Sequence, residues 1–155
     1  MSKIKAGTRV PDFSLPMTGG GTWRLKDAAG RKLVIYFYPR DMTSGCTRES
    51  QDFRDLTAAF RKAGTDLVGI SRDNLASHEK FAAKESLPFP LLADTEEKAC
   101  RLFDVIRKKS LYGRSFIGVE RSTFLLDGSG RLQQEWRKVK VPGHAEAVLE
   151  AAQRL

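Results

Sequence analysis

An unbroken apolar and aromatic run, Leu33-Val34-Ile35-Tyr36-Phe37-Tyr38, is the feature that most constrains the fold of this chain. It lies between Arg31-Lys32 and Pro39. Apolar positions without polar alternation are typical of a strand that is buried on both faces. Such a strand needs helices on each side of its sheet. The run therefore predicts an α/β architecture in layers.

The rest of the chain alternates between helical and extended patterns, which supports a parallel-containing sheet. After the run, the patterns predict helices over residues 47–63, 74–85, from Asp94 or Thr95 to Phe103, and 144–155, with strands over 66–71, 91–93, 121–127 and 131–139. Before it, Asp12–Leu15 and Thr22–Arg24 flank three glycines and predict a small hairpin.

Length and composition fit one globular domain over residues 1–155. The chain is 41% hydrophobic and 30% charged, and chains of this size usually form a single core. No run reaches the roughly 20 apolar residues that span a bilayer, and residues 1–10 contain only scattered apolar positions. We therefore expect a cytoplasmic protein with no signal peptide and no membrane partner.

The chain is basic, with 27 Lys and Arg against 19 Asp and Glu, a formal net charge of +8. The basic residues are spread through the sequence, and the densest sets, Arg107-Lys108-Lys109 and Arg137-Lys138-Lys140, are short. We interpret them as solvated surface and do not expect nucleic acid as a partner. A basic polyanion-binding protein, in which the cysteines are incidental, remains an alternative.

Cys46 and Cys100 are the only cysteines, and there are two histidines. No CxxC or HxxxH spacing is present, so we expect no metal site. Two isolated thiols in a reducing compartment are better explained as one buried residue and one reactive residue than as a structural disulfide.

Cys46 follows the central strand by eight residues and stands where a helix begins. Unpaired N–H groups and the helix dipole at such a position favour an anion, so a thiol placed there ionises more easily than a free thiol. The dipole contributes only about 0.3 to 1 kcal/mol. A guanidinium at ~4 Å contributes roughly 4 kcal/mol before desolvation is subtracted. A reactive Cys46 therefore needs a cation from elsewhere in the chain.

Pro39, Thr43 and Cys46 form a PxxxTxxC pattern that resembles the active-site signature of peroxiredoxins. The surrounding Tyr36–Asp41 segment is similar to the peroxiredoxin Q subfamily, also called bacterioferritin comigratory proteins. The similarity continues at Ala6-Gly7, Pro11–Pro16, Val68–Ser71, Leu91–Asp94 and Arg121–Asp127. It implies a thioredoxin-like fold with a central mixed sheet flanked by helices and an N-terminal hairpin extension.

The resemblance implies a thiol peroxidase that reduces hydrogen peroxide and alkyl hydroperoxides. Cys46 matches the nucleophile that becomes a sulfenic acid, Thr43 the hydroxyl that binds thiolate and peroxide, Pro39 the residue that shields the thiolate from water, and Arg121 the cation. Glu49 matches a position that orients the arginine, although helix N-terminal charge complementarity explains it equally well. The resemblance implies no metal, haem or flavin. It implies thioredoxin, glutaredoxin or a small thiol as reductant, and we expect a monomer.

Two positions depart from the family pattern. Ser44 stands where proline is familiar, and Gln51 stands where many members carry a resolving cysteine, five residues after the nucleophile. Cys100 or an external thiol must then complete the cycle. Because Cys100 shares a predicted helix face with Ala99 and Phe103, we interpret it as core. We therefore favour a one-cysteine cycle, with a two-cysteine cycle through Cys100 as the alternative.

A cysteine hydrolase that uses His78 or His144 as its base is a further alternative. Both histidines are expected at the surface or at a helix cap. Among the aromatic residues, Phe116 and Trp136 are candidates for the border of the pocket.

Overall fold

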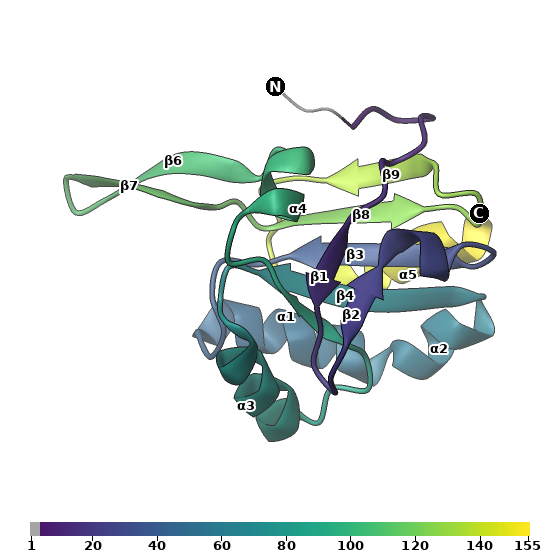
Figure 1. Ribbon diagram of the computed structural model, residues 1–155, viewed down its shortest axis with the longest axis horizontal. Helices are drawn as coiled ribbons and strands as arrows, with labels where there is room; N and C mark the ends of the chain where they lie inside the picture. The colour runs from purple at the N-terminus through teal and green to yellow at the C-terminus, as the bar shows by residue number, and fades with distance from the viewer. Residues whose placement is uncertain (1–3) are drawn as a thin grey trace.

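The computed structural model describes residues 4–155. From the sequence we expect no signal peptide in residues 1–10, and the first three of these lie outside the described residues. A five-stranded sheet forms the centre, in the order β5-β4-β3-β8-β9 (Figure 1). The apolar run is its middle strand, as predicted. The strands are β3 (Lys32–Phe37), β4 (Thr65–Ser71), β5 (Leu91–Ala93), β8 (Ser122–Leu126) and β9 (Leu132–Trp136). β3, β4 and β5 are parallel, whereas β8 is antiparallel to both β3 and β9, so the sheet is mixed.

Alternate residues of β3 enter two separate hydrophobic clusters on the two faces of the sheet. Leu33, Ile35 and Phe37 belong to one cluster, and Val34 and Tyr36 belong to the other. The first face is covered by β1 (Ser14–Pro16), β2 (Thr22–Arg24), the 3-10 helix η1 (Leu25–Ala28) and α4 (Lys98–Leu102). The second is covered by α1 (Ser44–Asp55), α2 (Thr57–Lys62), α3 (Leu75–Glu85) and α5 (His144–Arg154). This is the thioredoxin-like arrangement expected from the sequence, including the N-terminal hairpin β1–β2.

The single helix predicted over 47–63 is wrong in two respects. It begins earlier, at Ser44, and it is interrupted at Leu56, where α1 ends and α2 follows. The Leu56 amide bonds to the carbonyl of Phe53, three residues back, and the Thr57 hydroxyl donates to the same carbonyl at 3.0 Å. This side-chain bond competes with the helical ladder. The interruption turns the chain without a glycine or a proline.

The helix expected from Asp94 or Thr95 is also shorter than predicted, because α4 begins only at Lys98. Glu97 precedes it with φ of 61°. Asp94 still bonds to the first turn of the helix, since its Oδ2 accepts a hydrogen bond from the Cys100 amide at 2.7 Å. The last strand, predicted to Val139, ends at Trp136.

A second hairpin was not predicted. Strands β6 (Ile106–Leu111) and β7 (Arg114–Val119) pair along their whole length and project beyond the body of the molecule (Figure 1). Tyr112 and Gly113 form its two-residue turn, both with positive φ, which matches the twist of a tight hairpin. Part of this hairpin is the Arg107-Lys108-Lys109 set that the sequence analysis interpreted only as solvated surface.

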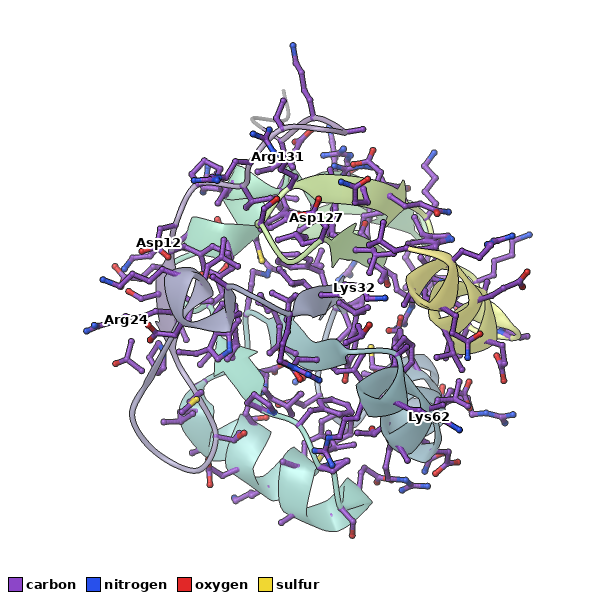
Figure 2. All side chains as sticks on the ribbon, turned by 90° about the vertical axis from the view of Figure 1, so that its right-hand side faces the viewer. Asp12, Arg24, Lys32, Lys62, Asp127 and Arg131 are labelled. Atoms are coloured by element: carbon purple, nitrogen blue, oxygen red, sulfur yellow. The ribbon has the colours of Figure 1, made fainter. Side chains whose placement is uncertain are left out.

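Charged side chains are distributed around the end of the molecule opposite this hairpin (Figure 2). Arg24, Lys32, Lys62 and Arg131 lie around this end, with Asp12 and Asp127 among them. Lys32 Nζ donates to the carbonyls of Ala152 and Leu155. These cations do not form one basic patch at this end. Among the described residues, no helix is long and apolar enough to cross a membrane.

Candidate active site

Cys46 lies in the first turn of α1, just beyond the end of the central strand β3. Only 1% of the residue is exposed, and it packs in the cluster that contains Tyr36 and Tyr38. Thr43 is the N-cap residue, and its carbonyl accepts a hydrogen bond from the Thr47 amide at 2.8 Å. The sulfur is therefore held at the positive end of a helix, as the sequence predicted.

Arg121 supplies the cation that the sequence analysis required. Its Nη2 donates to Cys46 Sγ at 3.4 Å, and its Nη1 donates to Glu49 Oε1 at 2.7 Å. Arg121 immediately precedes β8, which pairs with β3, so the sheet fixes the backbone next to Arg121. One planar guanidinium thus joins the thiol to a carboxylate, a geometry that a lysine point charge does not offer.

Gly45 makes room for this guanidinium. A β-carbon at position 45 would lie 3.1 Å from Arg121 Nη2 and 3.9 Å from its Cζ. A contact of 3.1 Å is tighter than nine in ten real β-carbon contacts, so a side chain here would push the guanidinium back by a few tenths of an ångström. The glycine before Cys46 is therefore explained by close approach.

Glu49 is 1% exposed, and its Oε2 has no hydrogen-bond partner among the described residues. Burial raises the pKa of this carboxyl to about 7, although the positive charge and the hydrogen bond of Arg121 oppose the rise. Of the two sequence interpretations of Glu49, the contact with Arg121 is present in the structure. Because the Glu49 carboxyl titrates near neutral pH beside Arg121, its protonation state affects how strongly the positive charge of Arg121 acts on Cys46.

Thr43 and Pro39 are near Cys46 in sequence, but neither makes a polar contact to its sulfur. The Thr43 side chain is exposed, and its hydroxyl donates to the Arg40 carbonyl at 3.0 Å. A hydroxyl has one hydrogen to donate, so it must rotate before it can donate to a thiolate or a peroxide. Pro39 is half-buried and opens the loop between β3 and α1.

Two residues near the site were missed or misplaced by sequence reasoning. Lys109, on β6, donates to the Val119 carbonyl at 2.6 Å. Burial lowers the pKa of Lys109, and so does the charge of Arg121, while Cys46 acts in the opposite direction.

His144, expected at the surface or a cap, begins α5 but is only 7% exposed. Its Nε2 lies 2.8 Å from Thr123 Oγ1, and burial lowers its pKa to about 4. Trp136 packs against the His144 ring, whereas Phe116 stands exposed on β7.

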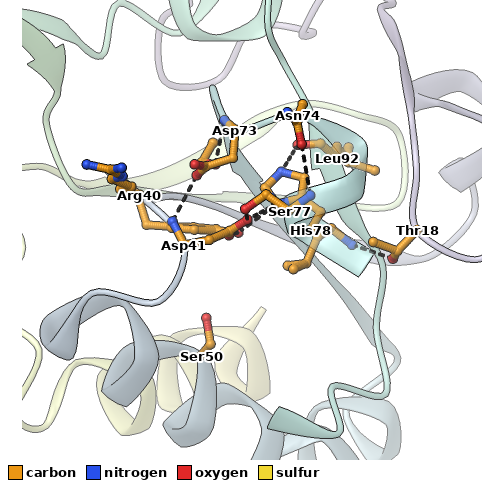
Figure 3. A network of polar contacts seen from close by, with 12 residues as sticks. Thr18, Arg40, Asp41, Ser50, Asp73, Asn74, Ser77, His78 and Leu92 are labelled. Carbon is orange, nitrogen blue, oxygen red and sulfur yellow. Dashed lines mark hydrogen bonds and ion pairs between the residues drawn. The ribbon is translucent and has the colours of Figure 1, made fainter. Parts of the chain in front are cut away.

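His78 was also expected at the surface or a cap, and this prediction is wrong. The residue is fully buried and forms the centre of a polar network beneath the loop between β3 and α1 (Figure 3). Its Nδ1 lies 2.7 Å from Asp41 Oδ2, and its Nε2 lies 2.9 Å from the Leu92 carbonyl. Tyr38 Oη and Ser77 Oγ also donate to Asp41, each at 2.7 Å. The signal in the sequence was the loop residue Asp41, which pairs with a histidine 37 positions away.

These bonds determine where the protons lie. A carbonyl only accepts, so Nε2 of His78 carries a hydrogen. Burial by itself raises the pKa of Asp41, but the bonds from His78, Tyr38 and Ser77 lower it overall, which keeps the carboxylate ionised. Nδ1 must then carry a hydrogen as well. With both ring nitrogens occupied, His78 is not free to act as the base of a cysteine hydrolase.

Asp41, Asp73 and His78 bring three potential metal ligands within 4.8 Å of one another. Each is already satisfied by the protein, since Asp73 Oδ2 accepts from the Asp41 amide at 2.8 Å and from Ser71 Oγ at 2.5 Å. A cation here would have to displace the proton between His78 and Asp41. The donor set fits a structural network better than a metal centre.

Comparison with known proteins places this chain in a family. Residues 6–135 match the model of the AhpC/TSA family. The chain belongs to this family. Peroxiredoxin Bcp of Xanthomonas campestris is 52% identical over 140 residues, which cover 90% of this chain and 88% of that protein. Peroxiredoxin Bcp of Bacillus subtilis is 47% identical over 147 residues, covering 95% and 94%.

Solved structures agree with the sequence relatives. Peroxiredoxin Q of Xanthomonas campestris aligns with a TM-score of 0.88 at 51% identity, covering 92% of this chain and 90% of that one. A variant of PrxQ from Xylella fastidiosa aligns with a TM-score of 0.93 at 38% identity, covering 99% and 98%. The subfamily indicated by the residues around Cys46 is thereby confirmed. This peroxiredoxin is a thiol peroxidase, an oxidoreductase that acts on a peroxide and uses a thiol reductant.

Proposed function

We propose that this peroxiredoxin reduces hydrogen peroxide and alkyl hydroperoxides at Cys46. The thiolate attacks the terminal oxygen of the peroxide, and a sulfur lone pair forms the S–O bond. The O–O bond breaks, and its electron pair leaves with the alkoxide or hydroxide, which takes up one proton. Cys46 becomes a sulfenic acid, and the products are an alcohol or water. No metal, haem or flavin takes part in this step.

The contact from Arg121 Nη2 to Cys46 Sγ at 3.4 Å is the observation that carries the proposal. The guanidinium stabilises the thiolate and then the negative charge that moves onto the departing oxygen. Thr43 is proposed to rotate its hydroxyl from the Arg40 carbonyl toward the peroxide, and Pro39 to keep water from the sulfur. Glu49 is proposed to orient Arg121 through its Oε1.

A relative supports the alkyl substrate class. A structural study of Xanthomonas campestris bacterioferritin comigratory protein, 50% identical to this chain, concerns its alkyl peroxide reduction activity. We extend that substrate class to this chain together with hydrogen peroxide.

We propose that an external thiol, rather than Cys100, resolves the sulfenic acid. Cys46 and Cys100 are both buried and belong to the clusters on opposite faces of the central sheet. Burial raises the pKa of the Cys100 thiol, and the neighbouring Asp94 carboxylate raises it further, so Cys100 is a poor nucleophile at neutral pH. At the position where many relatives carry a resolving cysteine, Gln51 Nε2 donates to Glu85 Oε1 at 2.8 Å, which ties α1 to α3. Thioredoxin, glutaredoxin and small thiols are the candidate reductants.

The wider setting of this activity is also proposed. We infer that residues 1–155 form one domain that acts as a monomer in the cytoplasm. The mixed sheet with its two hydrophobic clusters supports the single domain.

Replacement of the nucleophile tests the proposal. Cys46→Ser is expected to abolish peroxide consumption supported by dithiothreitol, because a serine hydroxyl is not ionised at neutral pH, while the circular dichroism spectrum stays unchanged. Peroxide consumption at the wild-type rate in this variant would exclude Cys46 from the reaction.

A further inference from the structure

The projecting hairpin β6–β7 exposes most of the large apolar side chains that the described chain leaves at its surface. Of six such residues, Leu111, Tyr112, Phe116 and Ile117 lie on this hairpin, and 57%, 95%, 46% and 56% of each residue is exposed. A fifth, Met42, is 46% exposed in the loop that leads to Cys46. Apolar groups gathered at one end of a molecule usually mark an interaction site.

The same hairpin is basic throughout. Between Asp104 and Glu120 the chain carries Arg107 and Lys108-Lys109 on one strand and Arg114 on the other, with no acidic residue. Arg107 pairs with Asp104 and Glu120, and Lys109 is held at the Val119 carbonyl. Within residues 4–155, Lys108 and Arg114 form no ion pair. Of these two cations, Arg114 is paired across the strands with the exposed Leu111, and a cation beside an exposed apolar group complements an acidic partner.

Strand register separates the two faces of the hairpin. Directly paired residues share a face, so Leu111 and Arg114 lie on the same face as the pair Lys109 and Phe116. The Lys109 side chain donates to the Val119 carbonyl at 2.6 Å, two residues before Arg121, whose Nη2 contacts Cys46 Sγ. This face therefore lies on the side of the thiol, in agreement with the electrostatic interaction of Lys109 with both Arg121 and Cys46. Lys108 lies on the opposite face, because it neighbours Lys109 along the strand.

The proposed one-cysteine cycle requires an external thiol to reach a sulfur that is almost completely buried. The thiol must attack the sulfenic acid of Cys46, form an S–S bond as the S–O bond breaks, and release water. A second thiol of the reductant then attacks the reductant's sulfur in this mixed disulfide, so that a disulfide forms within the reductant, the mixed S–S bond breaks and the Cys46 thiol is regenerated. A protein that delivers the first thiol must therefore bind to the surface next to Cys46.

We propose that the hairpin face bearing Leu111, Arg114 and Phe116 is the docking surface for a protein thiol reductant whose reactive thiol lies on an acidic and apolar surface. A second copy of this chain is a poor occupant, because it presents the same basic hairpin and a formal net charge of +8. The inference rests on the proposed resolution of Cys46 by an external thiol.

Charge reversal on the two faces tests the proposal, with an acidic thioredoxin as the protein reductant and dithiothreitol as the small one. Arg114→Glu is expected to lower kcat/KM for the thioredoxin roughly tenfold, the lower end of the usual electrostatic steering effect, and to leave dithiothreitol-supported turnover unchanged. Lys108→Glu on the opposite face and Lys62→Glu on α2 make the same change in net charge and are expected to have little effect. Added salt should slow the wild type and leave Arg114→Glu nearly unaffected.

A second variant separates apolar contact from charge. Leu111→Ser keeps the net charge and is expected to lower kcat/KM for the thioredoxin severalfold, with turnover by dithiothreitol again unchanged. Equal losses in Arg114→Glu and Lys108→Glu, unchanged kinetics in both Arg114→Glu and Leu111→Ser, or no turnover of the wild type with the thioredoxin would each overturn the docking proposal. So would hairpin-dependent binding to anionic vesicles with unaltered thioredoxin kinetics. Loss of dithiothreitol-supported turnover in the wild type would instead refute the proposed peroxidase cycle.

Discussion

One guanidinium contacts both the thiol and the buried acid of this site, so the charge of Arg121 is shared between Cys46 and Glu49. The sharing depends on protonation. When Glu49 is ionised, its negative charge compensates much of the positive charge of Arg121. When Glu49 is protonated, Arg121 stabilises the Cys46 thiolate more strongly. The reactivity of Cys46 is therefore set by a group that need not touch the peroxide.

Removal of the cation tests the centre of this arrangement. Arg121→Met is expected to slow peroxide reduction by about a hundredfold or more, the usual cost of losing a donor to developing negative charge. Alkylation of Cys46 by iodoacetamide at pH 7 should slow as well, because the thiolate loses its cation. Arg121→Lys should recover part of the rate, since lysine restores the charge without the planar fork. Equal alkylation rates in the wild type and Arg121→Met would contradict the role of the arginine.

The buried acid produces a pH dependence of stability with a definite sign. The pKa of Glu49 is raised from 4.5 to about 7, so between these values the folded protein keeps a proton that the unfolded chain has lost. Its contribution to the free energy of unfolding is fully present below about pH 4.5 and falls by up to about 3 kcal/mol as the pH rises to about 7.

Urea denaturation of the wild type and Glu49→Gln across this range isolates the effect. The stability of the wild type relative to Glu49→Gln is expected to decline as the pH rises. His144, whose pKa is lowered to about 4, adds stability with rising pH from about 4 to 6.5, but it is present in both proteins and cancels in the difference. A difference that is constant with pH would show that Glu49 does not titrate in this window.

At the scale of elements, the His78–Asp41 pair connects the loop that carries the reactive cysteine to α3 and β5. Removing one partner of a buried pair leaves the other charge without compensation. His78→Ala is therefore expected to lower the free energy of unfolding by about 3 to 5 kcal/mol in urea denaturation. Lys80→Ala, an exposed neighbour on α3, should change it by less than about 0.5 kcal/mol. Similar small losses in both variants would argue against an ionic pair.

The sequence predicted the elements whose patterns are local. The run in β3 and the glycine-rich N-terminal hairpin have distinct periodicity or turn signals, and both are present. The hairpin β6–β7 was missed because its apolar residues face outward, so no buried stripe marks it. The break at Leu56 was missed because no glycine or proline stands there to mark it.

The candidate site also combines features that the local sequence predicts with features that it does not. The contact between Arg121 and Cys46 joins residues 75 positions apart, and only the family resemblance pointed to it. The burial of His78 and His144 followed from no local pattern, because each depends on elements distant in the chain, Asp41 for the first and Thr123 for the second. The position of Cys46 at a helix start, by contrast, followed from the adjoining residues alone.

At the scale of the whole molecule, the central sheet separates the two thiols. Cys46 packs on the face covered by α1, α2, α3 and α5, and Cys100 on the face covered by α4 and the N-terminal hairpin. A disulfide needs Cα atoms within about 7 Å. A bond between these cysteines would require the sheet or its covering helices to open.

Cys100→Ser is consequently expected to keep dithiothreitol-supported turnover close to that of the wild type. After one equivalent of peroxide, mass spectrometry of the wild type with dimedone should find the reagent on Cys46 and no link between the two cysteines. A Cys46–Cys100 disulfide at full occupancy, together with complete loss of turnover in Cys100→Ser, would establish the two-cysteine cycle instead.

Because Gly45 has no β-carbon, it favours the contact between Arg121 and Cys46 at the expense of helix stability. Alanine is the better helix former, by about 1 kcal/mol in helix interiors, so it would strengthen the opening turn of α1. Its β-carbon would also lie 3.1 Å from Arg121 Nη2 and would push the guanidinium by a few tenths of an ångström. A more rigid start to this helix would therefore come with a looser contact between the guanidinium and the thiol.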